Sequence, residues 1–319
     1  MTGPGHSITE HTAEGFAGVT LRCDESEIEA SFLPEAAMLC HSLRHRGDEL
    51  LGQRHGINAY VEDGKTMGIP LLHPWANRVT EESFTVAGRD VRIDTDSPMV
   101  STEQNGLPIH GLNTSMRGWR LETQDADRDR AIVTGQLAFG SKELLDVFPF
   151  PHEIRASAEL RGPTLTITTE VYATSAAGLP VSFGFHPYFQ LPGSAREDWD
   201  MSVPLTERLV LDPRGIPTGA RQPASVNQGR LEQRTFDDAF LAPAGGAPFK
   251  LRGGGRQIQL LFSPEYGFSQ LFAPPDDAVV AFEPMTAPTN ALVSGGPELT
   301  VIEEGATYRA RFTLALSDA

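Results

Sequence analysis

Alternation of apolar and polar residues with a period of two limits the fold of this chain more than any other feature. The clearest run is Thr164–Ala173, in which leucine, isoleucine, threonine and valine fall in turn on one face. Similar runs occupy residues 28–32, 257–262 and 308–316. Because successive side chains of a β-strand point to opposite faces of a sheet, these runs predict half-buried antiparallel strands.

Turn residues separate these runs, and helical periodicity is nearly absent. Ala87-Gly88-Arg89-Asp90 predicts a hairpin, and Gly253-Gly254-Gly255 predicts a β-turn. Residues 35–43 are too short and too compatible with a strand to establish a helix. Many strands and few short helices are typical of an all-β sandwich or barrel. No segment rich in proline, glycine or serine divides the chain, so we expect a single domain over residues 1–319.

The charge of the chain argues against several classes of partner. The 319 residues carry 42 acidic and 26 basic side chains, a formal net charge of −16. A field of that sign repels phosphate backbones and anionic lipid surfaces, so we expect no nucleic-acid and no membrane partner. No apolar run approaches the length of about 18 residues that a membrane-spanning helix needs.

Targeting and redox signals are weak. The N-terminal segment has neither the basic nor the apolar region of a signal peptide, which predicts a cytoplasmic protein. Asn113-Thr114-Ser115 matches an N-glycosylation triplet, but such a triplet is not glycosylated in a protein that is not secreted. Cys23 and Cys40 form no CxxC pair, so we predict two buried free thiols and no cysteine-based metal site.

Five polar residues stand in otherwise apolar segments and are candidates for a functional site. They are Arg78 in LLHPWANRV, His110 in PIHGL, His186 in VSFGFHPYF, Asp237 in FDDAF and Glu283 in AVVAFEPM. A charged side chain in such surroundings is paired or functional, because burying an unpaired charge is costly. Glycine-rich phosphate loops, serine-nucleophile motifs and zinc-protease motifs do not occur in the sequence.

The first two candidates each have a structural explanation as well as a functional one. The donors of Arg78 suit sugar hydroxyls or a carboxylate, and a structural ion pair explains this residue equally well. His110 precedes Gly111, which gives a ligand room to approach the backbone, although a core or turn histidine is the more common case.

The other three candidates include two groups suited to acid–base chemistry. His186 lies among four aromatic residues, whose desolvation shifts the pKa of an imidazole and whose flat surfaces suit a ligand pocket; most of these rings are expected in the core. Asp237 and Asp238 could divide their work, one binding hydroxyls and the other facing water. Glu283 ends an apolar run that predicts a buried strand, and burial raises the pKa of a carboxyl toward the range of a general base.

Together these elements resemble the aldose 1-epimerase (galactose mutarotase) family. The shared elements are, in chain order, Asn77-Arg78, His110-Gly111, His186-Pro187-Tyr188-Phe189, Asp237 three residues before Phe240, and Glu283-Pro284. The His-Pro-Tyr-Phe and Glu-Pro elements are the specific ones. The resemblance implies a galactose mutarotase-like β-supersandwich, which is a large antiparallel β-sandwich with one concave site. It also implies an isomerase that uses no cofactor and no metal.

The resemblance implies a role for each matched residue. Glu283 is the implied general base that takes the proton of the anomeric hydroxyl, and His186 is the implied general acid that protonates the ring oxygen. The implied sugar-binding residues are Asn77, Arg78, His110, Asp237 and Tyr188. The implied partner is a free aldohexose such as galactose or glucose, and we expect a monomer or a homodimer. One acid and one base suffice for opening a cyclic hemiacetal.

The chain departs from the family pattern at three places, which concern the choice of sugar more than the reaction. Leu112 replaces a glycine, Gln190 replaces an asparagine, and the segment after Pro284 differs. An epimerase for another sugar or for a hexose phosphate is therefore a competing hypothesis, since Arg117 and Arg120 follow His110 closely. A non-catalytic carbohydrate-binding protein on the same scaffold is a second, and a glycoside hydrolase with Asp237 and Glu283 as its two carboxylates is a third. A hydrolase leaves the histidines without a role.

Overall fold

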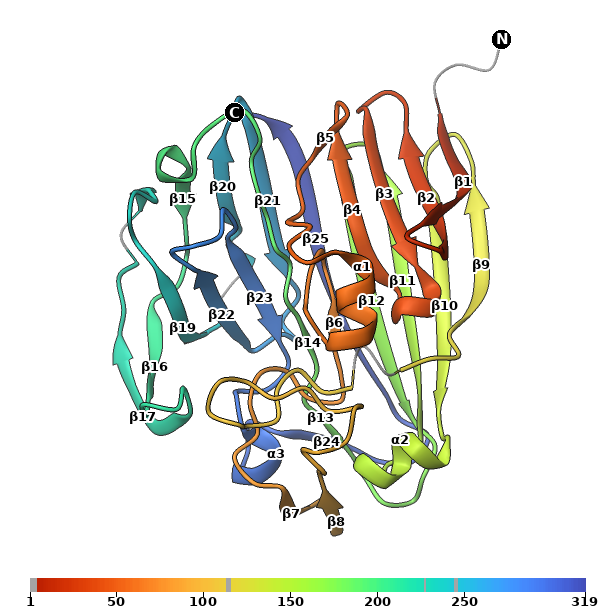
Figure 1. Ribbon diagram of the computed structural model, residues 1–319, viewed down its shortest axis with the longest axis vertical. Coiled ribbons are helices and arrows are strands. Elements are labelled where there is room, and N and C mark those ends of the chain that lie inside the picture. The colour runs from red at the N-terminus through yellow and green to blue at the C-terminus, as the bar shows by residue number, and fades with distance from the viewer. Residues whose placement is uncertain (1–4, 113–115, 227, 244–245) are drawn as a thin grey trace.

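Antiparallel strands make up most of the fold, as the alternation of apolar and polar residues predicts. The computed structural model describes residues 5–112, 116–226, 228–243 and 246–319, so the triplet Asn113-Thr114-Ser115 lies outside the described residues. Three sheets of five, seven and nine strands dominate the described part of the chain (Figure 1).

The nine-stranded sheet is the largest layer. Its strands, in spatial order, are β18 (Gly229–Arg230), β15 (Asp200–Ser202), β20 (Phe249–Gly253), β21 (Arg256–Phe262), β25 (Thr307–Asp318), β12 (Thr164–Ala173), β11 (His152–Arg161), β10 (Ala131–Phe139) and β9 (Arg120–Ala126). The predicted strand over residues 164–173 is confirmed with the same bounds, and its apolar face is buried. Gly254 and Gly255 form the turn between β20 and β21, which confirms the predicted β-turn.

The other two large sheets have five and seven strands. The five-stranded sheet runs in chain order through β1 (His6–Ala13), β2 (Phe16–Cys23), β3 (Ile28–Leu33), β4 (Leu39–His45) and β5 (Asp48–Glu49). The seven-stranded sheet has the order β17 (Pro217–Pro223), β16 (Glu207–Leu211), β19 (Phe236–Leu241), β22 (Phe268–Ala273), β23 (Ala281–Met285), β14 (Gly184–Phe185) and β6 (Leu71–Leu72).

Short elements complete the described chain. They are the hairpin of β7 (Ser83–Val86) with β8 (Arg89–Arg92), the pair of β13 (Leu179–Val181) with β24 (Thr300–Ile302), the helices α1 (Gly56–Asp63), α2 (Lys142–Val147) and α3 (Ala291–Ser294), and the 3-10 turns Pro34–Ala36 and Arg196–Asp198. The predicted hairpin at residues 87–90 is therefore confirmed, with Ala87 and Gly88 in its turn. None of the described helices has the length and apolar character needed to cross a lipid bilayer.

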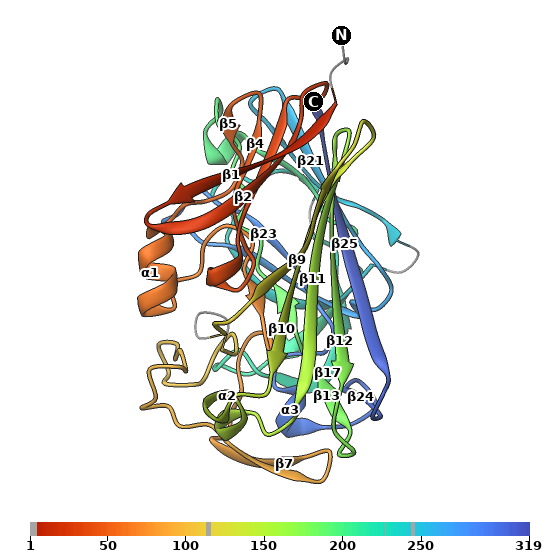
Figure 2. The ribbon, with the colours of Figure 1, turned by 90° about the vertical axis from the view of Figure 1, so that its right-hand side faces the viewer.

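The core lies between the layers of this sandwich. Figure 2 shows the five-stranded sheet on one side and strands β9 to β12 on the other. Inward side chains such as Leu165, Phe312 and Leu314 are fully or nearly fully buried in one hydrophobic cluster. Cys23 and Cys40 are free and buried, as predicted.

The five-stranded and seven-stranded sheets meet along a short seam. Phe189 forms β-bridges with Leu51 on one side and Val280 on the other, and Cys40 of β4 bridges to Ile69. The segment that carries His186 and Tyr188 therefore runs along the junction of the two sheets. Because both sheets hold this segment, the side chains on it have little freedom to move.

Candidate active site

Two neighbouring strands of the seven-stranded sheet bring the acid and base candidates together. His186 directly follows β14, Glu283 is the central residue of β23, and the two strands pair through Gly184 and Met285. The Nε2 atom of His186 lies 3.2 Å from Oε1 of Glu283, and their side chains are only 6% and 2% exposed. The sequence separates these residues by almost a hundred positions, and the sheet topology makes them partners.

Aromatic and imidazole rings surround His186. The ring of Tyr188 stacks on it at 4.1 Å with an interplanar angle of 16°. Phe272 of β22 approaches edge-on at 5.2 Å, and His110 approaches edge-on at 5.7 Å. Phe183 and Phe189, by contrast, are fully buried core side chains, as the sequence predicts for most of these rings.

Burial favours the neutral forms of both members of the pair. It raises the pKa of the Glu283 carboxyl well above its usual value, and the nearby charge of Asp237 raises it further. It lowers the pKa of the His186 imidazole well below its usual value, helped by His110 and Arg54. The pair therefore holds one proton over a wide range of pH. When both groups are neutral, that proton is on the Glu283 carboxyl.

The backbone at His110 is held in an unusual conformation. Asn77 and His110 both have positive φ, 59° and 63°, and the amide of His110 donates to the carbonyl of Asn77 at 3.0 Å. The expectation that Gly111 leaves room for a ligand is wrong. A Cβ atom at Gly111 would lie 2.2 Å from the carbonyl oxygen of His73, so the missing side chain admits neighbouring main chain instead. Burial, followed by the charge of Arg78, lowers the pKa of His110 to about 3.

Arg78 lies between two carboxylates at the rim of the pair. Its Nε atom is 3.7 Å from Glu103 Oε2 and its Nη2 atom is 3.7 Å from Asp237 Oδ2, while Nη1 donates to Asn77 Oδ1 at 3.0 Å. Gly215 approaches the guanidinium so closely that a Cβ there would lie 3.0 Å from Nη1. Arg78 thus has ion-pair partners, and its guanidinium also joins Asp237 to the rest of the site.

Asp237 is the solvent-exposed residue beside Arg78, and the buried Gln270 contacts it from below the surface. The Asp237 side chain is 54% exposed, and its Oδ1 atom accepts a hydrogen bond from Gln270 Nε2 at 2.6 Å. Gln270 is buried and lies opposite Glu283 in the β22–β23 register. Asp238 pairs with Arg208, and its side chain is 21% exposed against 54% for Asp237, so the aspartate outside this group is not the one that faces water.

Sequence reasoning missed Gln270, Glu103, Arg54 and Phe272. A buried glutamine in the apolar strand FSQLFA carries the same signal that pointed to Glu283, namely a polar side chain that needs a partner. Glu103 lies in a loop of ordinary polar composition and Arg54 in a turn, so neither has a comparable local pattern.

Several buried polar atoms at the site have no hydrogen-bond partner within the described residues. They are Glu283 Oε2, His186 Nδ1, His110 Nδ1 and Gln270 Oε1. Buried donors and acceptors are normally satisfied, so this concentration is typical of a site that binds a hydroxyl-rich ligand. The set contains two oxygen atoms and two imidazole nitrogens, and each imidazole nitrogen donates or accepts according to its tautomer.

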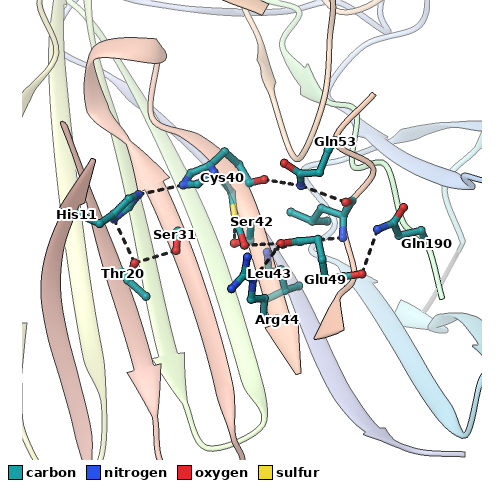
Figure 3. Close-up of polar contacts among 12 residues, drawn as sticks. His11, Thr20, Ser31, Cys40, Ser42, Leu43, Arg44, Glu49, Gln53 and Gln190 are labelled. Carbon is teal, nitrogen blue, oxygen red and sulfur yellow. Dashed lines mark hydrogen bonds and ion pairs between the residues drawn. The ribbon is translucent and has the colours of Figure 1, made fainter. Parts of the chain in front are cut away.

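The other predicted residues have different surroundings. Arg117 lines a cavity of about 550 Å³ with Glu62 and Glu143, and Arg120 begins the edge strand β9. Gln190 donates from Nε2 to the carbonyl of Glu49 at 3.1 Å, so its amide secures the seam between the sheets (Figure 3). Among the described residues, no group of three or more histidine, cysteine, aspartate and glutamate side chains is arranged to hold a metal ion.

Comparison with known proteins agrees with this fold. The sequence pattern of the aldose 1-epimerase family matches residues 37–315, so the chain belongs to that family. No curated protein matches the sequence.

Solved structures with the same fold are distant in sequence. A galactose mutarotase-like protein from Clostridium acetobutylicum is 17% identical with a TM-score of 0.86, over 99% of each chain. A galactose 1-epimerase from Lactobacillus acidophilus is 14% identical with a TM-score of 0.77, also over 99% of each chain. An aldose epimerase homologue from C. elegans is 15% identical with a TM-score of 0.72, over 99% of this chain and 100% of that one. At such identities the likeness establishes the galactose mutarotase-like fold.

Proposed function

Because the chain belongs to the aldose 1-epimerase family, we propose that it interconverts the α and β anomers of a free aldohexose such as galactose or glucose. The observation that carries the proposal is the buried contact between His186 Nε2 and Glu283 Oε1 at 3.2 Å. A carbohydrate-binding protein needs hydroxyl partners but has no use for a matched acid and base in a desolvated site.

The proton balance of the reaction fits this pair. In the reactive form Glu283 is a carboxylate and His186 is protonated. Glu283 takes the proton of the O1 hydroxyl while His186 gives its proton to O5, so the C1–O5 bond breaks and the C1–O1 bond becomes a carbonyl. The pair is then neutral at both members, which is the form that burial favours. Rotation about C1–C2 and reversal of both transfers give the other anomer without a net proton exchange.

The remaining site residues are proposed to bind the sugar. Arg78, His110 and Asp237 stand beside the pair, and Asn77 holds both Arg78 and His110 through hydrogen bonds. Tyr188, for which the resemblance implies sugar binding, is buried with its ring stacked on His186, and we propose that it acts through that imidazole instead.

The charges of the site favour an uncharged sugar over a hexose phosphate. Arg78 is already paired with Glu103 and Asp237, and Arg54 is paired with Asp277. These three carboxylates outnumber the two guanidinium groups even without Glu283, which disfavours a dianionic phosphate group. Arg117 and Arg120, which made a phosphate conceivable from the sequence, are not part of this cluster.

The single domain, the monomer or homodimer and the cytoplasmic location stay predictions from the sequence.

Polarimetry tests the proposed reaction directly. Freshly dissolved α-D-glucose and α-D-galactose are followed to equilibrium rotation with and without the protein, in a buffer that catalyses little. We expect a faster approach to the same end point, and no acceleration by the Glu283→Gln variant. Sugar binding without acceleration, measured by calorimetry, contradicts the proposal and supports a carbohydrate-binding protein.

A further inference from the structure

A stack of three side chains supports the imidazole of His186. The guanidinium carbon of Arg54 lies 4.4 Å from the centre of the Tyr188 ring, and that ring stacks on His186 at 4.1 Å. The two groups cannot share one face of the phenol at these distances, so Arg54 covers one face and His186 the other. The cation is then at most about 8.5 Å from the imidazole centre.

The position of Tyr188 leaves it little surface for a ligand. Both faces of its ring are covered, and its hydroxyl forms a hydrogen bond of 2.6 Å with Thr66 Oγ1. The side chain is 2% exposed. A guanidinium over a phenol ring is a favourable cation–π contact, and it fixes the plane of the ring beneath it.

Several contacts hold Arg54 over this ring. Its Nε atom donates to Asp277 Oδ2 at 2.9 Å, and its backbone adopts a positive φ of 43°, which is unusual for a side chain of this size. The amide of Gly52 donates to the carbonyl of Tyr188 at 2.8 Å, so the two chain segments run side by side.

Side-chain hydrogen bonds fix the same two segments to the five-stranded sheet, as Figure 3 shows. Gln53 Nε2 donates to the carbonyls of His41 and Leu51 at 2.9 and 3.1 Å, and Gln190 Nε2 donates to the carbonyl of Glu49. Gln53 immediately precedes Arg54, and Gln190 lies two residues after Tyr188. Hydrogen bonds therefore anchor the chain on both sides of the stack, next to Arg54 and close to Tyr188.

We propose that Arg54 is a positioning residue for His186, which acts through Tyr188 to hold the imidazole plane toward Glu283 and to favour release of its proton to the sugar. The proposal rests on the proposed function, because it assigns His186 the role of the acid. In this arrangement Arg54 and His186 cover the two faces of the Tyr188 ring, so this tyrosine contributes to catalysis through the imidazole.

The sign of the expected effect follows from the charges around His186. Glu283 faces it from β23, His110 from the loop that precedes Gly111, and Tyr188 and Arg54 from the stack, while Phe272 of β22 brings no charge. Further out, Arg78 acts on His110 and Asp237 acts on Glu283. Removing the cation of Arg54 while these groups stay in place makes it easier for His186 to hold a proton. We expect its pKa to rise by roughly half a unit to one unit.

The first test observes His186 without any sugar. The ring nitrogens of ¹⁵N-histidine-labelled protein are followed by NMR from about pH 8 down to the lowest pH at which the protein stays folded, because burial lowers the pKa of His186 well below that of a free imidazole. The His186 signals are assigned with the His186→Gln variant. In Arg54→Gln we expect His186 to take up its proton at higher pH than in the unmodified protein. Identical titration curves overturn the proposal whatever the protein does with sugar, and a shifted curve without mutarotation leaves the positioning intact and rejects only the proposed function.

The second test uses kinetics. We expect Arg54→Gln to lower kcat about tenfold with KM changed less than about twofold, and to move the acidic limb of the pH profile to higher pH. Arg54→Lys keeps the charge but lacks the planar fork, so it should restore the position of the limb. Arg22→Gln on β2 removes an exposed ion-paired arginine and serves as the control. A raised KM with unchanged kcat identifies Arg54 as a sugar ligand and overturns the proposal, and near-UV circular dichroism confirms that each variant is folded.

Discussion

The Nε2 atom of His186 and the Oε1 atom of Glu283 are 3.2 Å apart and nearly inaccessible to solvent. Two titratable groups this close exchange a proton easily, and the neutral pair and the ion pair contain the same number of protons. In the proposed reaction, ring opening converts the ion pair to the neutral pair, and ring closure converts it back. Burial favours the neutral pair, which is the state of the protein that would accompany the open-chain sugar.

The first prediction concerns Glu283→Gln. The amide keeps the shape of the side chain but cannot take a proton from O1, so we expect kcat for mutarotation to fall by about 10²–10⁴-fold. Burial raises the pKa of Glu283 in the folded protein, so the wild-type carboxyl costs stability as pH rises through that raised value. The variant escapes this cost, and its Tm should equal or exceed that of wild type, increasingly at alkaline pH.

The exposed Glu304, in the turn before β25, provides the matched control. Glu304→Gln makes the same chemical substitution at an exposed position and should leave both kcat and the pH dependence of Tm unchanged. Polarimetry and thermal unfolding measure the two effects. Wild-type turnover in Glu283→Gln would remove this residue from the role of base.

The second prediction is a broad pH plateau for kcat/KM. Activity requires one proton on the pair. A second proton disables the base at low pH, and loss of the only proton disables the acid at high pH. Burial lowers the pKa of His186 and raises that of Glu283, so the two limits of the plateau move apart. Polarimetry over a pH series should show little change around neutral pH, and a rate that climbs continuously with pH would contradict the one-proton requirement.

The third prediction compares two rim residues of opposite charge. Asp237 raises the pKa of Glu283 and Arg78 lowers it. Asp237→Asn should therefore move the alkaline limb of the kcat/KM profile to lower pH, and Arg78→Met should move it to higher pH, each by roughly half a unit. Both variants should also raise KM, because both lose a group that is proposed to bind the sugar. If the alkaline limb moved in the same direction in both variants, at least one of the two charges would not act on Glu283 as proposed.

The sequence contains most of the information for the fold. The alternation in residues 164–173 predicts β12 with its bounds and its buried face, because a period of two has only one structural meaning over ten residues. The order of strands in the nine-stranded sheet, in which β25 lies between β21 and β12, has no local pattern. It results from the packing of segments that are far apart in the chain.

The site was predictable only where a polar residue interrupts an apolar strand. Glu283 and His186 have this pattern, and their contact follows once β14 and β23 are known to be neighbours. The sequence pattern at His110-Gly111 predicts space for a ligand, whereas the His73 carbonyl fills that space. Arg54 lies in an exposed turn, and its place over Tyr188 depends on two segments held together by backbone hydrogen bonds.

The fourth prediction concerns a second buried pair, formed by His73 and His152, whose Nε2 atoms are 2.8 Å apart. The carbonyl of Phe150 accepts a hydrogen bond of 2.6 Å from His152 Nδ1, so Nε2 of the neutral His152 is the acceptor and His73 is the donor. The remaining nitrogen, His73 Nδ1, is then unprotonated, and it is buried without a partner in the described residues. Stacking on Phe139 at 4.3 Å completes the enclosure of His152.

This arrangement makes the protein sensitive to acid. Burial lowers the pKa of His152 from 6.5 to about 4, and burial and the charge of His152 lower that of His73 well below its usual value. Below pH 6.5 the unfolded chain binds protons that the folded chain does not, so the free energy of unfolding falls as pH falls. Each histidine that stays neutral in the fold contributes up to about 1.4 kcal/mol per pH unit. Urea unfolding between pH 7 and the pKa of His152 should therefore show a steep loss of stability.

His152→Gln separates this pair from the other buried histidines. A glutamine amide can donate to the Phe150 carbonyl and accept from His73, but it cannot be protonated. The variant should lose part of its stability at neutral pH, because the stacked ring is gone, while its slope against pH becomes shallower by up to about 1.4 kcal/mol per unit. His55→Gln, at an exposed position before α1, is the matched control and should keep the wild-type slope. Equal slopes for wild type and His152→Gln would mean that acid unfolding begins elsewhere in the molecule, with His110 and His186, whose pKa values burial also lowers, as the next candidates.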